Sequence, residues 1–345
     1  MTLNDFHTPV YLSTGVEICR TVKGAEKINV PLFISSMTNT NYGDEIIVEY
    51  ELSHTNYIAE EKLIKSDNFK IKYNPWMQKS IKPLELIMPN SSGLSKLIFR
   101  VKTLDNKILH RNFMHFEVNS NNKLKDVEVI SLPAKEISNS NWTKKKWEIL
   151  NGKKINGAGS GFFEYKIKIP SNFKTLNFNE AYFIIEASAK ELFDKDKKGE
   201  DYVDAGMDWM RGSKVSPSKN PNSYPMTDKT FFPSKINISV NGKSKSKMTL
   251  IDDPADHRGV LSWHNQIKSS AKATDDDWWK NQPELNEAGS YGYLIKIPIS
   301  NNELISSLKK GDLNIRIQTE GEGGIAIYGK SFGRYPINPS LIIKK

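Results

Sequence analysis

The stretch FFEYKIKI at residues 162–169 decides the fold class, because apolar and charged side chains alternate along it. Phe163, Tyr165 and Ile167 fall on one face of an extended chain, and Glu164 falls on the other. A period of two predicts a strand that is buried on one side and solvated on the other. A proline follows the run and ends it.

A similar phrase, GSYGYLIKIP, occurs at residues 289–298. Both copies place an aromatic residue before an apolar stripe and a proline, which predicts two equivalent strands of one jelly-roll sandwich. Asn241-Gly242 follows an alternating run and predicts a type I′ hairpin, since both turn positions need a positive φ. Further strands are expected at 181–187, 235–240, 313–317, 325–328 and 341–343, and short helices at 190–197 and 303–309.

The first third of the chain also shows strand signals. The run EIIVEYEL at residues 45–52 places Ile46, Val48 and Tyr50 on one face, and a turn composition precedes it. Other strands are expected at 30–35, 97–101 and 113–118. Short strands at this spacing predict an immunoglobulin-like sandwich.

These patterns predict an all-β chain with two sandwiches. Residues 119–145 are rich in Asn and Ser and contain Pro133, which is typical of a linker. A polar, aromatic-bearing stretch at about 193–231 is expected to be an ordered, functional loop. The predicted organisation is an extension at 1–24, an immunoglobulin-like sandwich at 25–118, the linker at 119–145, and a jelly roll at 146–345.

The composition limits the class of protein. Of the 345 residues, 38% are hydrophobic and 26% charged, which supports packed cores. No apolar run reaches the roughly 18 residues of a membrane span. The N-terminus lacks a signal-peptide pattern, so the protein is expected to be intracellular, or an interior part of a longer secreted chain and then extracytoplasmic. The single cysteine, Cys19, excludes an internal disulfide framework.

The formal charge of +9 is spread over scattered lysines, and the densest basic stretch is WTKKKW at 142–147. The sequence has no nucleic-acid-binding motif, so nucleic acid is not expected as a partner, and an anionic glycan remains open. No carboxylate pair, Gly-x-Ser-x-Gly elbow or His-Glu-x-x-His spacing marks a catalytic site. No cofactor is predicted, although Asp252-Asp253 and 275–277 leave a structural calcium site open.

The second half of the chain concentrates residues that suit sugar binding. Pyranose rings offer an apolar C–H face to flat aromatic side chains, and their hydroxyls need a few placed polar groups. Adjacent tryptophans in a polar stretch cannot both enter a core from one strand, because a strand sends them to opposite faces. The predicted carbohydrate-binding residues are Trp209, Arg211, Tyr224, Asp256, Arg258, Trp263, His264, Trp278, Trp279 and Arg334. Arg258 and Arg334 also suit carboxylate or sulfate groups.

Four stretches of this half resemble the C-terminal region of large glycoside hydrolase family 2 proteins, of the β-galactosidase/β-glucuronidase type. They are NPNSYPMTD (220–228), DDPADHRGVLSWH (252–264), EAGSYGYL (287–294) and FGRYPINP (332–339). The resemblance implies a galactose-binding-like jelly roll, and residues 25–118 resemble the immunoglobulin-like domain that precedes it. The catalytic TIM barrel of that family needs about 250 residues of alternating strands and helices, which this chain lacks.

Three hypotheses follow. The first is a non-catalytic carbohydrate-binding region of a family 2 glycoside hydrolase that acts on polysaccharide. The second is a structural module that supports a catalytic domain or an oligomer. The third is an unrecognised β-sandwich enzyme that degrades polysaccharide.

Overall fold

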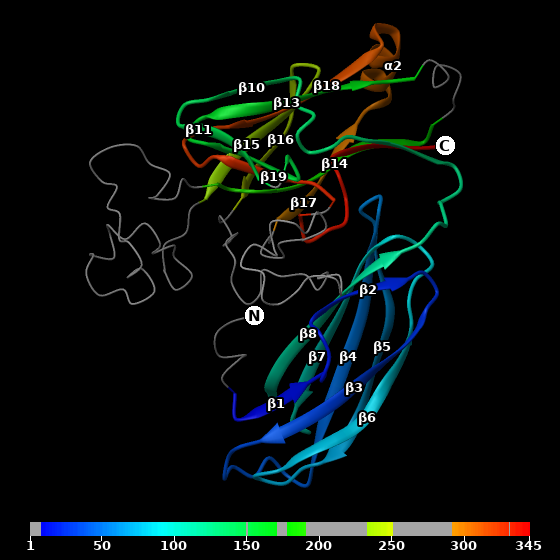
Figure 1. The fold of residues 1–345 in the computed structure, drawn as a ribbon, viewed down its shortest axis with the longest axis vertical. Coiled ribbons are helices and arrows are strands. Elements are labelled where there is room, and N and C mark those ends of the chain that lie inside the picture. Colours follow the sequence, from blue (N-terminus) through cyan, green and yellow to red (C-terminus); the bar gives the residue numbers. More distant parts are fainter. Residues whose placement is uncertain (1–7, 150, 171–177, 191–232, 251–291, 331) are drawn as a thin grey trace, which may run out of the picture. The chain divides into compact units, whose positions relative to one another are not determined.

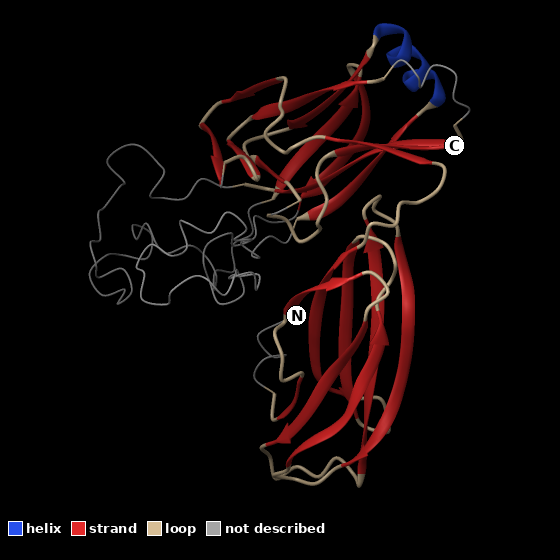
Figure 2. Cartoon of the chain, turned by 45° about the vertical axis from the view of Figure 1, so that its right-hand side comes forward, coloured by secondary structure: helices blue, strands red, loops and turns tan. Residues whose placement is uncertain are grey.

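The computed structural model describes residues 8–149, 151–170, 178–190, 233–250, 292–330 and 332–345. Their contacts divide them into two compact units, residues 8–125 and residues 126–345. Strands form almost all of the regular structure, and the described part contains a single helix (Figures 1 and 2). The predicted fold class is therefore confirmed: the chain is all-β and folds into sandwich-like layers. No described helix is long and apolar enough to span a membrane.

The first unit consists of two sheets. The smaller sheet has the order β1 (Val10–Ser13), β3 (Lys27–Ser36), β6 (Gln78–Ile87). The larger has the order β2 (Cys19–Lys23), β8 (Ile108–Asn119), β7 (Gly93–Lys102), β4 (Glu45–Asn56), β5 (Glu61–Lys72). Neighbouring strands are antiparallel except for the parallel pair β2 and β8.

The core of the first unit lies between these sheets and follows the predicted alternation. Ile46, Val48 and Tyr50 of β4 are buried there, as their period of two indicated. Pro31 in β3 has no N–H to donate, and the β3–β6 register shifts between Val30 and Leu32. Alternate strand residues therefore face the core between the two sheets, and a bulge occurs where Pro31 interrupts the β3–β6 hydrogen bonds.

The second unit has a five-stranded and a seven-stranded sheet. The five-stranded sheet has the order β10 (Asn139–Trp142), β13 (Gly161–Lys168), β18 (Asp312–Thr319), β15 (Ser234–Val240), β16 (Lys243–Leu250). The seven-stranded sheet has the order β11 (Lys145–Ile149), β12 (Lys154–Ala158), β19 (Ile325–Tyr328), β14 (Glu180–Ser188), β20 (Ser340–Lys344), β9 (Val127–Ser131), with β17 (Tyr293–Ile299) also paired to β14.

The core of the second unit joins these two sheets. Phe163, Tyr165 and Ile167 of β13 enter it from one sheet, and Ile295 and Ile297 of β17 belong to the same cluster. The two similar sequence segments thus supply strands of one sandwich, β13 and β17, but these strands lie in opposite sheets. The hairpin at Asn241-Gly242 is confirmed, with φ of 48° and 80° between β15 and β16.

The helix α2 (Asn301–Lys310) confirms the helix expected at 303–309. Glu303 accepts hydrogen bonds from the backbone N–H and the hydroxyl of Ser300, at 2.9 and 2.7 Å, which caps the first turn. The helix buries Leu304 and Leu308 in the core of the second unit. The other expected helix, at 190–197, falls almost entirely outside the described residues.

Two segments carry strands that the sequence did not indicate. The expected extension at 1–24 contains β1, paired with β3, and β2, paired with β8. The expected linker at 119–145 contains β9, paired with β20, and β10, paired with β13. These four strands have only four or five residues each, too few for a clear period, and all four end a sheet.

The glycines at 157 and 161, which had no assigned role, leave room for Trp142. A Cβ atom at Gly157 would overlap the indole ring of Trp142, and one at Gly161 would also lie against it. The ring packs against Phe163, with the two ring centroids 4.8 Å apart, at the edge of the core. The two glycines therefore allow a tryptophan to pack directly on backbone.

Gly157→Ala should destabilise the second unit by about 1–3 kcal/mol, because the added methyl group overpacks the Trp142 contact. Chemical denaturation measures this change in the free energy of unfolding. Gly321→Ala is the matched control, since a Cβ atom there meets nothing within 4 Å. Equal effects of the two substitutions would contradict the packing role of Gly157.

Candidate functional site

The outer face of the seven-stranded sheet carries a group of polar and aromatic side chains. Residues of β11, β12, β19 and β14 that lie opposite one another share a face, and the register gives two rows. We call six of these residues the outer-face cluster. One row contributes Trp147, Asn156 and Ser188, and the other contributes Lys154, Tyr328 and Glu186. All except Trp147 are fully buried, and Trp147 is partly exposed.

A hydroxyl pair lies near the centre of the cluster. Ser188 Oγ and the Tyr328 hydroxyl oxygen are 2.8 Å apart. Ser188 donates its hydroxyl proton to the carbonyl oxygen of Ala189 at 2.9 Å, so Tyr328 is the donor in the pair. This chain of two hydrogen bonds fixes both hydroxyl groups.

Two aromatic rings flank the ammonium group of Lys154. Its Nζ lies 4.7 Å from the ring centroid of Tyr328 and 5.5 Å from that of Phe332. The two rings are stacked, with an interplanar angle of 25°. A cation over aromatic faces gains electrostatic stabilisation, which offsets part of the cost of burying this lysine.

The side-chain amide of Asn156 has no hydrogen-bond partner in the protein on either its oxygen or its nitrogen, although the residue is fully buried. An unsatisfied buried amide costs about 1–3 kcal/mol. Its neighbours in the row are Trp147 on one side and the small Ala326 on the other. The cluster therefore holds one buried donor group and one buried acceptor, neither with a protein partner, beside an indole ring.

The two tryptophans of the WTKKKW stretch (142–147) lie in different environments. Trp142 packs against the core of the second unit, whereas Trp147 joins the outer face. The ammonium group of Lys145 lies 5.5 Å from the ring centroid of Trp147. This basic stretch thus supplies an aromatic surface with a cation beside it.

Glu186 ties two further segments to the sheet. Its carboxylate oxygens accept hydrogen bonds from the backbone N–H groups of Arg334 and Tyr335, both at 2.9 Å. The N–H of Gly292 is a third donor. A Cβ atom at Gly333 or Gly292 would overlap the Glu186 side chain, so both close approaches require glycine.

The surroundings of Glu186 suit a structural role better than acid–base catalysis. Burial raises the pKa of its carboxyl to about 7, and the backbone donors oppose that shift. Both oxygens are already engaged by the segments at 292 and 334–335, so a substrate would have to compete with them. The sequence motifs at 287–294 and 332–339 therefore meet at one buried carboxylate.

The structure places only one of the predicted sugar-binding residues. Arg334 is half-buried, and its backbone N–H binds Glu186. The other nine lie outside the described residues: Trp209, Arg211, Tyr224, Asp256, Arg258, Trp263, His264, Trp278 and Trp279. The aspartates considered for calcium, at 252–253 and 275–277, also lie outside them. Within the described ranges, no three His, Cys, Asp or Glu residues are grouped to hold a metal ion.

The sequence did not indicate the outer-face cluster. Lys154, Asn156 and Glu186 lie within strands, where polar side chains usually face solvent. One signal was present: Glu186 interrupts the run AYFIIEAS, which is apolar on both faces and therefore typical of a central strand. A lone carboxylate in such a run indicates a buried polar contact.

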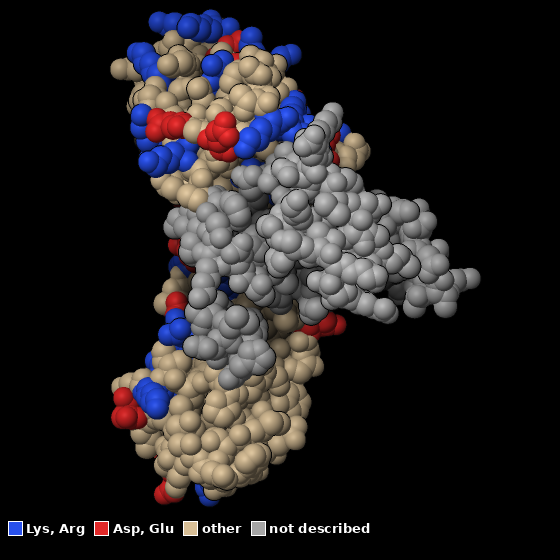
Figure 3. Space-filling view, turned by 90° about the vertical axis from the view of Figure 1, so that its left-hand side faces the viewer, with Lys and Arg blue, Asp and Glu red and all other residues tan. Residues whose placement is uncertain are grey.

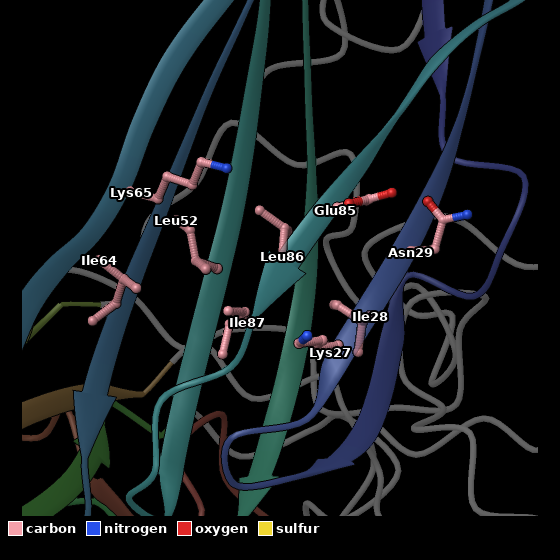
Figure 4. Close-up of a pocket in the computed structure, with 9 residues that line it drawn as sticks. All are labelled: Lys27, Ile28, Asn29, Leu52, Ile64, Lys65, Glu85, Leu86 and Ile87. Atoms are coloured by element: carbon pink, nitrogen blue, oxygen red, sulfur yellow. The ribbon is translucent and has the colours of Figure 1, made fainter.

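The first unit contains a pocket of about 670 Å³ between β3–β6 and β4–β5 (Figure 4). Its floor is aliphatic and its rim carries charged side chains; the lining residues are Lys27, Ile28, Asn29, Leu52, Ile64, Lys65, Glu85, Leu86 and Ile87. No aromatic side chain lines it, so it lacks the flat surface that a sugar ring needs.

Comparison with known proteins gives little similarity. No protein-family model matches the chain, and a search of curated proteins finds no match. Among solved structures, the alkylpurine DNA glycosylase AlkC of Pseudomonas fluorescens, bound to DNA containing an abasic site analog, is 14% identical over 33% of this chain and 31% of that chain, with a TM-score of 0.24.

A second solved structure is the family GH115 4-O-methyl-α-glucuronidase BtGH115A, which has specificity for decorated arabinogalactans. It is 10% identical and covers 66% of this chain and 18% of that chain, with a TM-score of 0.27. The chain thus spans less than a third of either protein. At these TM-scores, neither similarity assigns a family or a function.

The raised pKa of Glu186 predicts a pH-dependent stability. Because the folded-state pKa of about 7 lies above the ordinary value of 4.5, the contribution of this group is present below pH 4.5 and is lost as the pH rises through 7. The stability of the wild type relative to Glu186→Gln should fall across this window, by on the order of 3 kcal/mol. Urea denaturation at about pH 5 and about pH 8 measures the difference, and a pH-independent difference would rule out this assignment.

Proposed function

We propose that this chain is a non-catalytic carbohydrate-binding region of a larger glycoside hydrolase of the family 2 type, and that its second unit binds the sugar. The observation that supports this most is the unsatisfied amide of Asn156 next to the partly exposed indole of Trp147. An amide can donate to one sugar hydroxyl and accept from another, while the indole contacts the C–H face of the ring.

The cation beside this pair, Lys145, favours a sugar with a partial or full negative charge. The ammonium group of Lys145 lies beside the ring of Trp147. The visible surface of the second unit carries many Lys and Arg side chains (Figure 3). Uronate or sulfate groups would add charge-assisted hydrogen bonds to these contacts.

The residues predicted from the sequence extend this proposal. Trp209, Tyr224, Trp263, Trp278 and Trp279 offer aromatic surfaces, with Arg211, Asp256, Arg258, His264 and Arg334 as polar partners. We propose that they contribute further sugar contacts. A catalytic glycoside hydrolase domain is the proposed partner, in keeping with the family resemblance of the motifs at 220–228 and 252–264.

An interaction role is the second candidate, and the pocket of the first unit favours it. The pocket lies beside β5 and β6, each of which pairs with only one neighbour and ends its sheet. Edge strands with apolar side chains such as Ile64 and Ile87 can pair with another chain. The lysines along β5 act against uncontrolled pairing, so a docking partner would need complementary charge.

The substitution Asn156→Leu tests whether the amide serves sugar binding or the stability of the fold. Removing an unsatisfied buried amide should leave the free energy of unfolding unchanged or raise it by about 1–3 kcal/mol, whereas sugar affinity should fall. Trp147→Ala should weaken the same affinity roughly tenfold through loss of ring stacking. Calorimetric titration with neutral and acidic oligosaccharides measures both.

Ile305→Ala, on an exposed position of α2, is the control for these variants and should bind like the wild type. If the wild type binds no member of the panel, the sugar-binding proposal fails and the interaction role gains support. If Asn156→Leu unfolds the protein, the amide has a structural partner and the site assignment is wrong.

A further inference from the structure

Two loops meet at one end of the first sandwich. They connect β3 to β4 and β5 to β6, and Figure 1 shows both at the same end of the unit. Trp76 in the second loop is 65% exposed and Met37 in the first is 69% exposed. The N–H of Ser36 donates to the carbonyl of Met77 at 2.7 Å, which extends the β3–β6 ladder by one residue beyond the Ser35–Gln78 pair.

Trp76 has an unusual backbone for an aromatic residue. Its φ is 54°, in the left-handed region where a bulky side chain is strained and glycine is favoured. An exposed indole gains little from burial that could offset this strain. Such strain persists where the surroundings enforce it, and it is concentrated at functional sites.

Hydrogen bonds fix the indole and the loop beside it. Trp76 Nε1 donates to Asn39 Oδ1 at 2.6 Å, which sets the direction of the ring. The buried hydroxyl of Tyr73 donates to the carbonyl of Thr40 at 2.9 Å and lies 3.0 Å from the hydroxyl of Ser36. The aromatic surface is therefore held in place before any ligand arrives, which lowers the entropy cost of binding.

The exposed polar groups around Trp76 are mainly neutral. Asn39, Asn41, Asn74 and Gln78 are all exposed on the same two loops or at the start of β6. The face of the first unit seen in Figure 3 is also largely uncharged, in contrast to the second unit. Amides donate to and accept from hydroxyl groups without requiring a charge on the ligand.

We propose that Trp76 forms a second sugar-binding site, on the first unit, where a neutral pyranose ring stacks on the indole and the neighbouring amides bind its hydroxyls. This site is separate from the outer-face cluster and does not depend on it. It suits neutral oligosaccharides, whereas Lys145 beside the outer-face cluster favours acidic ones. A chain with both sites would contact a polysaccharide at two points and gain avidity.

The test uses the full chain carrying Trp147→Ala, so that binding at the outer-face cluster is weakened. Calorimetric titration with neutral hexasaccharides of glucose, xylose, mannose and galactose measures the remaining affinity. Adding Trp76→Gly should weaken binding of at least one of them by roughly fivefold to tenfold. The melting temperature should stay the same or rise, because glycine adopts the left-handed conformation without strain.

Ile18→Ala is the matched control, since Ile18 is 45% exposed and directly precedes β2, in the other sheet of the first unit. It should leave the affinity unchanged. Asn39→Ala should give a smaller loss than Trp76→Gly, because it frees the indole without removing it.

The proposal is overturned if no neutral hexasaccharide binds, or if Trp76→Gly binds as tightly as its parent. It is also overturned if Trp76→Gly abolishes self-association instead of sugar binding, since Trp76 would then be a protein contact. The outcome is independent of the outer-face cluster: an effect of Trp76→Gly without any effect of Trp147→Ala would leave this site standing and remove the other.

Discussion

The strand β14 is buried on both faces, and this burial constrains which segments of the second unit must pack against it. Its inward side chains form the core with β13 and β17, and its outward side chains are equally inaccessible. A carboxylate in such a strand must find donors, because an unpaired buried charge is very costly. Glu186 finds them in backbone N–H groups of two distant segments, so one side chain determines where the chain at 292 and at 334–335 must pass.

The same constraint, that buried polar groups need partners, makes any group in the outer-face cluster without a partner worth explaining. Most polar groups in it are satisfied: Ser188 and Tyr328 bind each other, and Lys154 lies over two rings. Asn156 differs, because neither amide atom has a partner within the protein. A leucine at this position would leave the stability unchanged or raise it. Retaining an amide there is what a binding role would require.

Alternation predicted the strands whose two faces differ. The runs at 45–52 and 162–169 have a clear period of two, and β4 and β13 bury the expected side chains. The edge strands β1, β2, β9 and β10 escaped prediction because each has only four or five residues, too few to show a clear period. Lys154 and Asn156 escaped for another reason: composition places such residues at the surface, and only the packing of segments far apart in sequence reveals that they are buried.

The tryptophans show how far residue type alone can guide the search for a site. Trp142 and Trp147 belong to one short motif, yet one packs on Gly157 at the core and the other lies beside an unsatisfied amide. Trp76 lies in a loop with no notable motif, yet its strained backbone and fixed indole set it apart. The groups around the indole ring therefore distinguish a proposed binding surface from a packing contact. The proposed surface has rigid support beneath the ring, amides beside it and an exposed face. Sequence supplies the indole, but these three conditions arise only when strands and loops come together in the fold.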